Sequence, residues 1–135
     1  MKILLYCKNT EGNEKAVQIA VDQAKAFDAS IHLVSGISEK KGVPREIIQD
    51  AIAKAEKKMQ QYVDTKIAPA GIVSSMEVVA TPASLGEMIV KTAEKNGVGT
   101  IVMSIQKRSK VGKMVFGSNS QYIILEAPCK VITVK

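Results

Sequence analysis

Apolar residues gather in five short runs along the chain, each bounded by polar or turn-forming residues. Short runs rich in Ile, Val and Leu are typical of strands that are buried on both faces of a sheet. We therefore expect strands at residues 1–7, 30–35, 72–80, 100–104 and 130–134.

The segments between these runs place apolar residues at helical spacing. Between residues 13 and 27, for example, Ala16, Val17, Ala20 and Ala24 fall on one face of a helix. Further helices are expected at residues 44–67, at residues 82–96, and after Gly117-Ser118 as far as residue 126. Strands that alternate with helices predict a parallel five-stranded sheet with helices on both faces, an α/β fold in a single domain, 1–135.

The composition of the chain favours some classes of binding partner over others. The net charge is +6, which favours anionic ligands, while an aromatic content of 4% argues against a stacking surface for nucleic acid. No apolar run is long enough to span a membrane. The two cysteines show no paired spacing, so we expect a cytoplasmic protein with reduced thiols.

A basic segment follows the fourth strand and leads into the last helix. It reads IQKRSKVGKMVFGSNS and holds four cationic side chains before Gly117-Ser118. A helix start preceded by glycine offers free N–H groups and partial positive charge to a phosphate. The alternative is a solvated basic loop before an ordinary helix capped by Ser118.

The same segment is similar to the motif G-x2-G-x9-G-[ST] of the universal stress protein family. Its four defined places fall on Ser104, Lys107, Gly117 and Ser118. Residues 3–17 resemble the family's opening ILVPVDGSExSxxAL, and residues 129–134 resemble its closing strand. The resemblance spans the whole chain and implies the adenine nucleotide α-hydrolase-like fold, with strand order 3-2-1-4-5.

The resemblance also implies a site for ATP or AMP, with no metal and no catalytic residue predicted. Base and ribose contacts would come from Lys8 and the backbone of Gly36, with Cys7 nearby. Ribose and phosphate contacts would come from Met103, Ser104 and Lys107. The phosphates would lie on the helix start at Gly117, Ser118, Asn119 and Ser120.

Three of these positions depart from the family pattern. Lys8 replaces an Asp, so an acceptor is lost and a cation gained. Ser104 and Lys107 replace glycines, which restricts close approach of the backbone to a ligand. These changes keep a second hypothesis open, a ligand-free interaction module that has lost nucleotide binding.

The family resemblance further implies a homodimer formed through the last strand, at residues 130–135. Nucleic-acid binding through the basic loop ranks third, and an enzyme of the nucleotide-α-hydrolase or adenylate-transferring kind ranks last. His32, the single histidine, is expected to be structural rather than a metal ligand or base. Cys7 is expected to be a small buried residue, with a lowered thiol pKa beside Lys8 as the alternative.

Overall fold

Five parallel strands form one sheet at the centre of the structure, a computed structural model that describes residues 1–9, 12–105 and 117–135. The strands are β1 (Lys2–Tyr6), β2 (Ser30–Ser38), β3 (Ser74–Thr81), β4 (Thr100–Ser104) and β5 (Lys130–Val134). Their order is β3-β2-β1-β4-β5, and each neighbouring pair is parallel. The parallel sheet and its strand order, both expected from the sequence, are confirmed.

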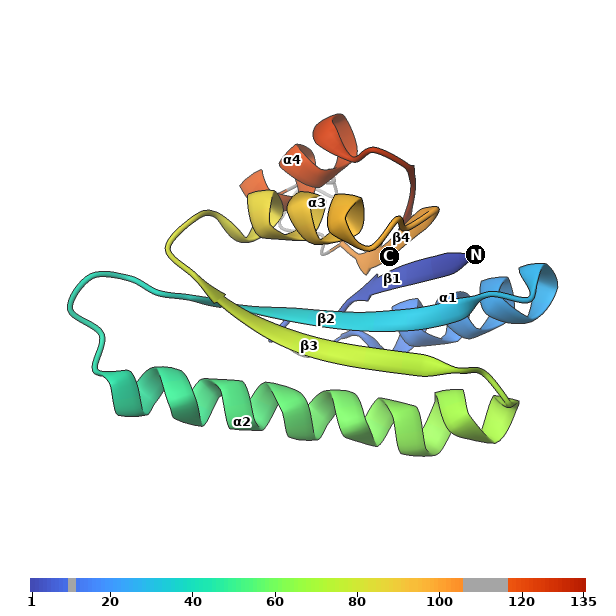
Figure 1. Cartoon of the computed structure of the whole chain (residues 1–135), viewed down its shortest axis with the longest axis horizontal. Helices are drawn as coiled ribbons and strands as arrows, with labels where there is room; N and C mark the ends of the chain where they lie inside the picture. The colour runs from blue at the N-terminus through green and yellow to red at the C-terminus, as the bar shows by residue number, and fades with distance from the viewer. Residues whose placement is uncertain (10–11, 106–116) are drawn as a thin grey trace, which may run out of the picture.

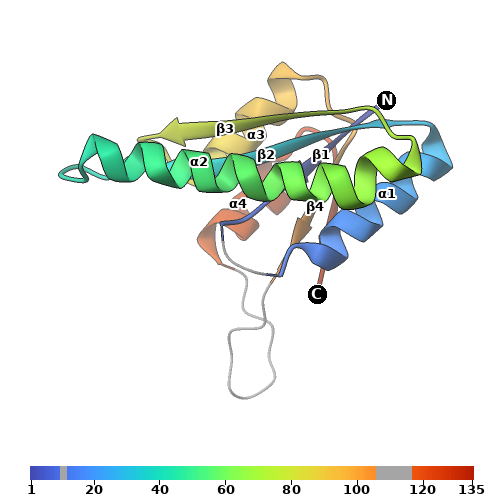
Figure 2. The same cartoon turned by 90° about the horizontal axis from the view of Figure 1, so that it is seen from below.

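Helices cover both faces of this sheet (Figure 1). The helices α1 (Glu14–Phe27) and α2 (Arg45–Tyr62) lie on one face, which Figure 2 views from outside, and α3 (Leu85–Lys95) and α4 (Ser118–Glu126) lie on the other. The chain moves outward from β1 to β3 and then crosses back to β4. Because such crossovers are right-handed, this reversal puts the two pairs of helices on opposite faces.

Strand β1 is buried because a helical layer covers each of its faces. Ile3 and Leu5 pack in the core beneath α1 and α2, whereas Leu4 and Tyr6 pack in the core beneath α3 and α4. The continuous apolar run of residues 1–7 reflects this burial on both sides. None of the helices in the described part of the chain has the length and apolar character that a membrane span requires.

Strand β2 is longer than the sequence predicts, since it pairs with β3 as far as Ser38 rather than ending at residue 35. Gly36, expected in a loop over residues 36–43, is therefore a strand residue. A Cβ atom at Gly36 would lie 2.6 Å from Met88 Cε and 2.8 Å from Leu85 Cδ2. The absence of a side chain at this position thus lets Met88 and Leu85 of α3 pack directly on the strand.

The last turns of the second helix depart from α-helical geometry. After Tyr62 the chain forms a π-helical turn (Val63–Ile67) and then a 3-10 turn (Ala68–Ala70). The apolar stripe ends near residue 67 as expected, and helical backbone continues to Ala70. Gly71, with φ of 76°, then ends it in the left-handed region that glycine favours.

The helices α3 and α4 touch at their amino ends, where Gly86 faces Asn119 and Tyr122. A Cβ atom at Gly86 would lie 3.0 Å from the Asn119 carbonyl oxygen and 3.1 Å from Tyr122 Cβ. The Gly86 N–H also donates to Asn119 Oδ1 at 2.9 Å. This contact fixes the start of α4 against the start of α3.

Replacing Gly86 with Ala should lower the free energy of unfolding by about 1–2 kcal/mol, because the added methyl group overpacks the contact with the α4 backbone. Better helix propensity offsets part of this loss. Urea denaturation measures the effect, and Gly99→Ala is the control because its new Cβ would approach only the Met1 side chain, no closer than 3.4 Å. An unchanged midpoint for Gly86→Ala would contradict the close contact.

The Cys7 thiol lies in the core beneath α1 and α2 and is almost fully buried. Burial raises the pKa of this thiol to about 12, which is the opposite of the lowered value considered as the alternative above. Cys7 therefore behaves as a small buried residue.

We expect Cys7 to resist alkylation by iodoacetamide at mildly alkaline pH, because the reactive thiolate does not form in the folded protein. Mass spectrometry of native and urea-unfolded protein measures this, with the unfolded chain as control. The unfolded thiol ionises near pH 9 and the folded thiol near 12, so this group makes stability fall as the pH rises above 9. Rapid labelling of Cys7 in the native protein would contradict the buried position.

Candidate functional site

The carboxyl ends of β1 and β4 meet the amino end of α4 at one edge of the sheet. Lys8 follows β1, and Ile105 follows β4, where its N–H donates to the Val134 carbonyl at 2.8 Å. Strand order reverses between β1 and β4. In open α/β sheets, ligands bind at this edge beside the point of reversal, so the site residues expected from the sequence belong here.

The start of α4 presents backbone N–H groups to this edge. Gly117 is the N-cap, with extended backbone (φ −66°, ψ 161°), and its carbonyl accepts from the Gln121 N–H at 3.0 Å. The N–H groups of Ser118, Asn119 and Ser120 therefore come before the first N–H that donates within the helix and have no acceptor inside it. Ser118 is the first helical residue rather than the cap, so the expected hydroxyl cap is wrong.

Lys8 brings a cation to the same helix start. Its Nζ lies 3.5 Å from Ser120 Oγ, in the first turn of α4. The backbone of Lys8 is held from both sides by Asn13, since the Lys8 N–H donates to Asn13 Oδ1 at 3.1 Å and Asn13 Nδ2 donates to the Lys8 carbonyl at 2.8 Å. Asn13 is fully buried. Asn13 thus fixes the backbone of Lys8, whose side chain extends toward α4.

Two sources of positive potential meet at this point. The amino end of a helix carries a partial positive charge, and an ammonium group beside it is electrostatically unfavourable unless an anion is present. Free N–H groups and a lysine are also the usual partners of phosphate. The arrangement can therefore hold an anion between Lys8 and the start of α4.

Other predicted site residues turn their side chains elsewhere. Asn119 accepts from the Gly86 N–H, so its carboxamide serves the contact between α3 and α4. Met103 is fully buried in the core beneath α3 and α4, and Ser104 is buried at the end of β4. Cys7 presents its thiol to the opposite core, so these last three residues offer a ligand little beyond backbone. Lys107 lies outside the described residues.

The Gly36 backbone, expected to contact a base, already has a partner. Asn9 Nδ2 donates to the Gly36 carbonyl at 2.7 Å, and Ser35 Oγ donates to Asn9 Oδ1 at 2.8 Å. The sequence analysis does not single out Asn9, Asn13 or Ser35 as site residues. The available signal was an Asn soon after a strand, because its side chain readily bonds nearby backbone groups.

A small cavity opens beside Asn9, between β2 and α2. Its volume is about 210 Å³, and it is lined by Asn9, Ile37, Ala51, Lys54, Ala55 and Lys58. Lys54 at its rim pairs with Asp50 at 3.1 Å. The cavity therefore combines an apolar floor with a cationic rim at the same edge of the sheet.

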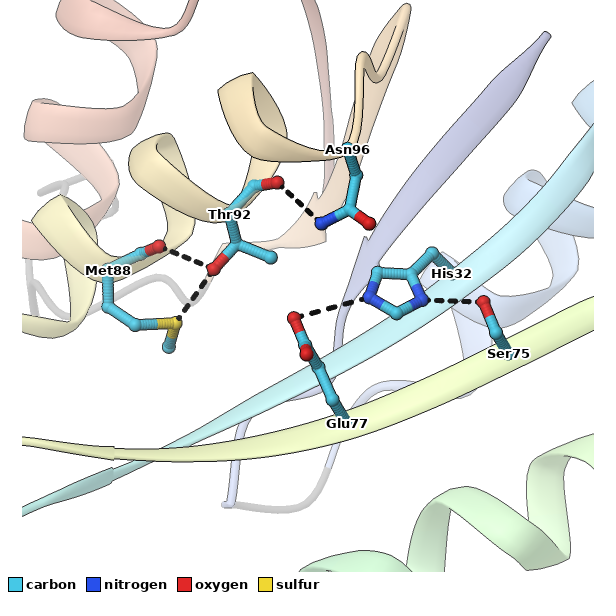
Figure 3. A network of polar contacts seen from close by, with 6 residues as sticks. All are labelled: His32, Ser75, Glu77, Met88, Thr92 and Asn96. Carbon is cyan, nitrogen blue, oxygen red and sulfur yellow. Dashed lines mark hydrogen bonds and ion pairs between the residues drawn. The ribbon is translucent and has the colours of Figure 1, made fainter.

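His32 lies away from this edge and has partners of its own (Figure 3). Its Nδ1 lies 2.6 Å from Ser75 Oγ, and its Nε2 lies 3.3 Å from Glu77 Oε1, outside hydrogen-bond geometry. These neighbours come from β3, so the ring bridges two strands, as a structural histidine does. Among residues 1–9, 12–105 and 117–135, no three His, Cys, Asp or Glu side chains gather as metal ligands would.

Comparisons with known proteins cover the whole chain. Residues 1–135 match the universal stress protein family. A search of curated proteins found no match.

Solved structures with the same fold include three universal stress proteins. One from Archaeoglobus fulgidus is 24% identical over 100% of this chain and 98% of its own, with a TM-score of 0.83. UspA from Lactobacillus plantarum is 17% identical over 100% and 97%, with a TM-score of 0.84. A universal stress protein from Archaeoglobus fulgidus in complex with dAMP is 20% identical over 100% and 98%, with a TM-score of 0.79.

The family match extends over every residue, and the strand order and helix placement agree with the fold of these structures. The chain belongs to the universal stress protein family.

Proposed function

We propose that the protein binds an adenine nucleotide such as ATP or AMP, with its phosphate at the amino end of α4. The observation that supports this most strongly is the Lys8 ammonium group, 3.5 Å from Ser120 Oγ in the first turn of that helix. A phosphate would interact favourably with both the cation and the helix end. The relative in complex with dAMP supports adenine as the base.

We expect binding rather than catalysis. The single histidine of the chain lies on β2 between Ser75 and Glu77, where it cannot act as a general base at the α4 edge. The two thiols, Cys7 and Cys129, are unpaired, which fits the cytoplasmic location expected from the sequence.

Isothermal titration of the whole protein with ATP, ADP and AMP tests the proposal. We expect saturable heat with at least one of the three nucleotides. The absence of heat with all three at millimolar concentration would overturn nucleotide binding and leave the family membership unaffected.

Replacing Lys8 with Gln should weaken ATP binding roughly tenfold, because a hydrogen bond to a charged group contributes about 1.5–3 kcal/mol, part of which Gln retains. The loss should shrink as salt concentration rises, since salt screens the ammonium group. Titration at two salt concentrations measures both effects. Lys91→Gln, on the exposed side of α3, is the charge-matched control and should bind as the parent does. Equal affinity of Lys8→Gln and the parent would remove Lys8 from the site.

A second candidate function is a ligand-free interaction module. Two side-chain contacts favour it: Asn119 is committed to Gly86, and Asn9 is committed to Gly36 and Ser35. In this case the protein would bind no nucleotide and would act through other copies or other proteins. A thermal denaturation midpoint that no nucleotide raises would favour this candidate over the first.

Under either function we propose a homodimer formed through β5. This strand has β4 as its one neighbour in the described sheet, and its apolar residues Val131, Ile132 and Val134 are half-buried. On the adjoining α4, Leu125 is 77% exposed. An uncovered edge with this much apolar surface needs a partner, and a second copy could supply one.

Replacing Thr133 with Pro should shift the dimer toward monomer. The Val134 carbonyl faces β4, where it accepts from Ile105, so the N–H of Thr133 points to the outer edge. Proline removes that donor and spares the bonds between β4 and β5. Light scattering coupled to size exclusion measures the mass, with Thr133→Ala as control. A Thr133→Pro variant that remains a dimer would place the interface elsewhere.

A further inference from the structure

Strand β2 continues past the end of β1, which leaves a β2 carbonyl group beyond the reach of a β1 amide. The Cys7 N–H donates to the Val34 carbonyl at 2.8 Å. Backbone groups alternate between the two edges of a strand, so the next β2 carbonyl on this edge belongs to Gly36. The N–H that would continue the ladder to this carbonyl is that of Asn9, two residues after Cys7, but the bond that Gly36 accepts comes from the Asn9 side chain. The edge carbonyl of Gly36 therefore needs a partner from outside the ladder.

The Asn9 carboxamide fills this place. Its Nδ2 donates to the Gly36 carbonyl at 2.7 Å, and its Oδ1 accepts from Ser35 Oγ at 2.8 Å. Ser35 is only 2% exposed, whereas Asn9 is an exposed residue. The two groups that Asn9 bonds, the Ser35 hydroxyl and the Gly36 carbonyl, are fixed in the strand. Asn9 itself is exposed, so its carboxamide can leave them and bond water instead at a small cost in free energy. Ser35 and Gly36 thus form a fixed donor and acceptor pair, which the Asn9 carboxamide occupies and can vacate.

Space for a larger occupant lies directly beside Asn9. The cavity of about 210 Å³ between β2 and α2 has apolar walls from Ile37, Ala51 and Ala55. A flat, apolar ring system could enter it and present its polar edge to Gly36 and Ser35. Such a group would need a donor and an acceptor on neighbouring atoms, as in the carboxamide that it replaces.

We propose that Asn9 is a built-in competitor for the base of the nucleotide, and that adenine binds by displacing its carboxamide. The exocyclic amine of adenine would donate to the Gly36 carbonyl, and the neighbouring ring nitrogen would accept from Ser35 Oγ. This inference rests on the proposed function. It adds that Asn9 lowers the affinity for the nucleotide, because the base must displace the Asn9 carboxamide in order to bind.

The expected size of the effect follows from two neutral hydrogen bonds. A ligand that binds only when Asn9 has moved away shows an affinity reduced by the fraction of molecules in that open state. Two bonds of ordinary strength, each partly replaced by water, reduce that fraction by about tenfold. Removing the carboxamide should therefore raise the affinity for AMP by about the same factor.

The test compares three ligands on the parent and on Asn9→Ala by isothermal titration. AMP carries the whole adenine edge, purine riboside 5′-monophosphate lacks the exocyclic amine, and ribose 5-phosphate lacks the base. We expect Asn9→Ala to bind AMP about tenfold more tightly. The gain should be about the same for purine riboside 5′-monophosphate, which must also displace the carboxamide, and absent for ribose 5-phosphate.

Two further variants keep the result interpretable. Asn9→Ser, whose short side chain cannot reach both Gly36 and Ser35, should give a similar gain for AMP even if Asn9→Ala folds poorly. Asn96→Ala is the matched control, because it loses an equivalent carboxamide bond, to the Thr92 carbonyl at 2.8 Å, at the far end of α3. It should bind all three ligands as the parent does.

The outcomes separate this inference from the proposed function. AMP binding to the parent with no gain, or a loss, in Asn9→Ala and Asn9→Ser would overturn the role of Asn9 and leave nucleotide binding intact. An equal gain for AMP and ribose 5-phosphate would also overturn it, because the effect would then concern the phosphate. If no variant binds AMP or ATP, both proposals fall.

Discussion

The end of strand β1 is the constraint from which the rest of the functional edge follows. The ladder between β1 and β2 closes with the bond from Cys7 to Val34, while β2 runs on to Ser38. A buried backbone group that loses its ladder partner must find another, since leaving it unpaired costs a large part of a hydrogen bond. Asn13 takes the Lys8 backbone and Asn9 takes the Gly36 carbonyl. Asparagine side chains thus supply the hydrogen bonds that the shorter strand β1 does not provide.

The same turn decides the electrostatics of the edge. Because Asn13 clamps the backbone of Lys8, the lysine side chain extends toward α4 and places its ammonium group beside Ser120. The start of α4 is in turn held by the contact between Asn119 and Gly86. A cation and a helix end are therefore fixed near one another, and their repulsion favours an anion between them. The bonds of Asn13 to Lys8 and of Asn119 to Gly86 therefore hold the fold together and also position the groups that attract an anion.

Sequence patterns predicted the architecture far better than the details of the edge. Apolar runs buried on two faces, such as residues 1–7, mark strands without any knowledge of their neighbours. The Ser84 cap of α3, whose Oγ accepts from the Glu87 N–H, is likewise a local signal. The sequence predicts a loop at Gly36 because the segment that follows the apolar run is polar and contains two glycines. The position of Gly36 under Met88 and Leu85 depends on a helix that begins far along the chain.

By itself, the sequence determined the alternation of strands and helices, the basic character of the chain and the glycine before α4, because these are properties of neighbouring residues. The tertiary structure alone decided that Lys8 meets Ser120, that Asn119 turns to Gly86 and that Asn9 bonds Gly36 and Ser35. Each of these contacts joins side chains and backbone groups from different strands or helices. Their partners are set by strand register and helix packing, which the periodicity of a single segment cannot encode.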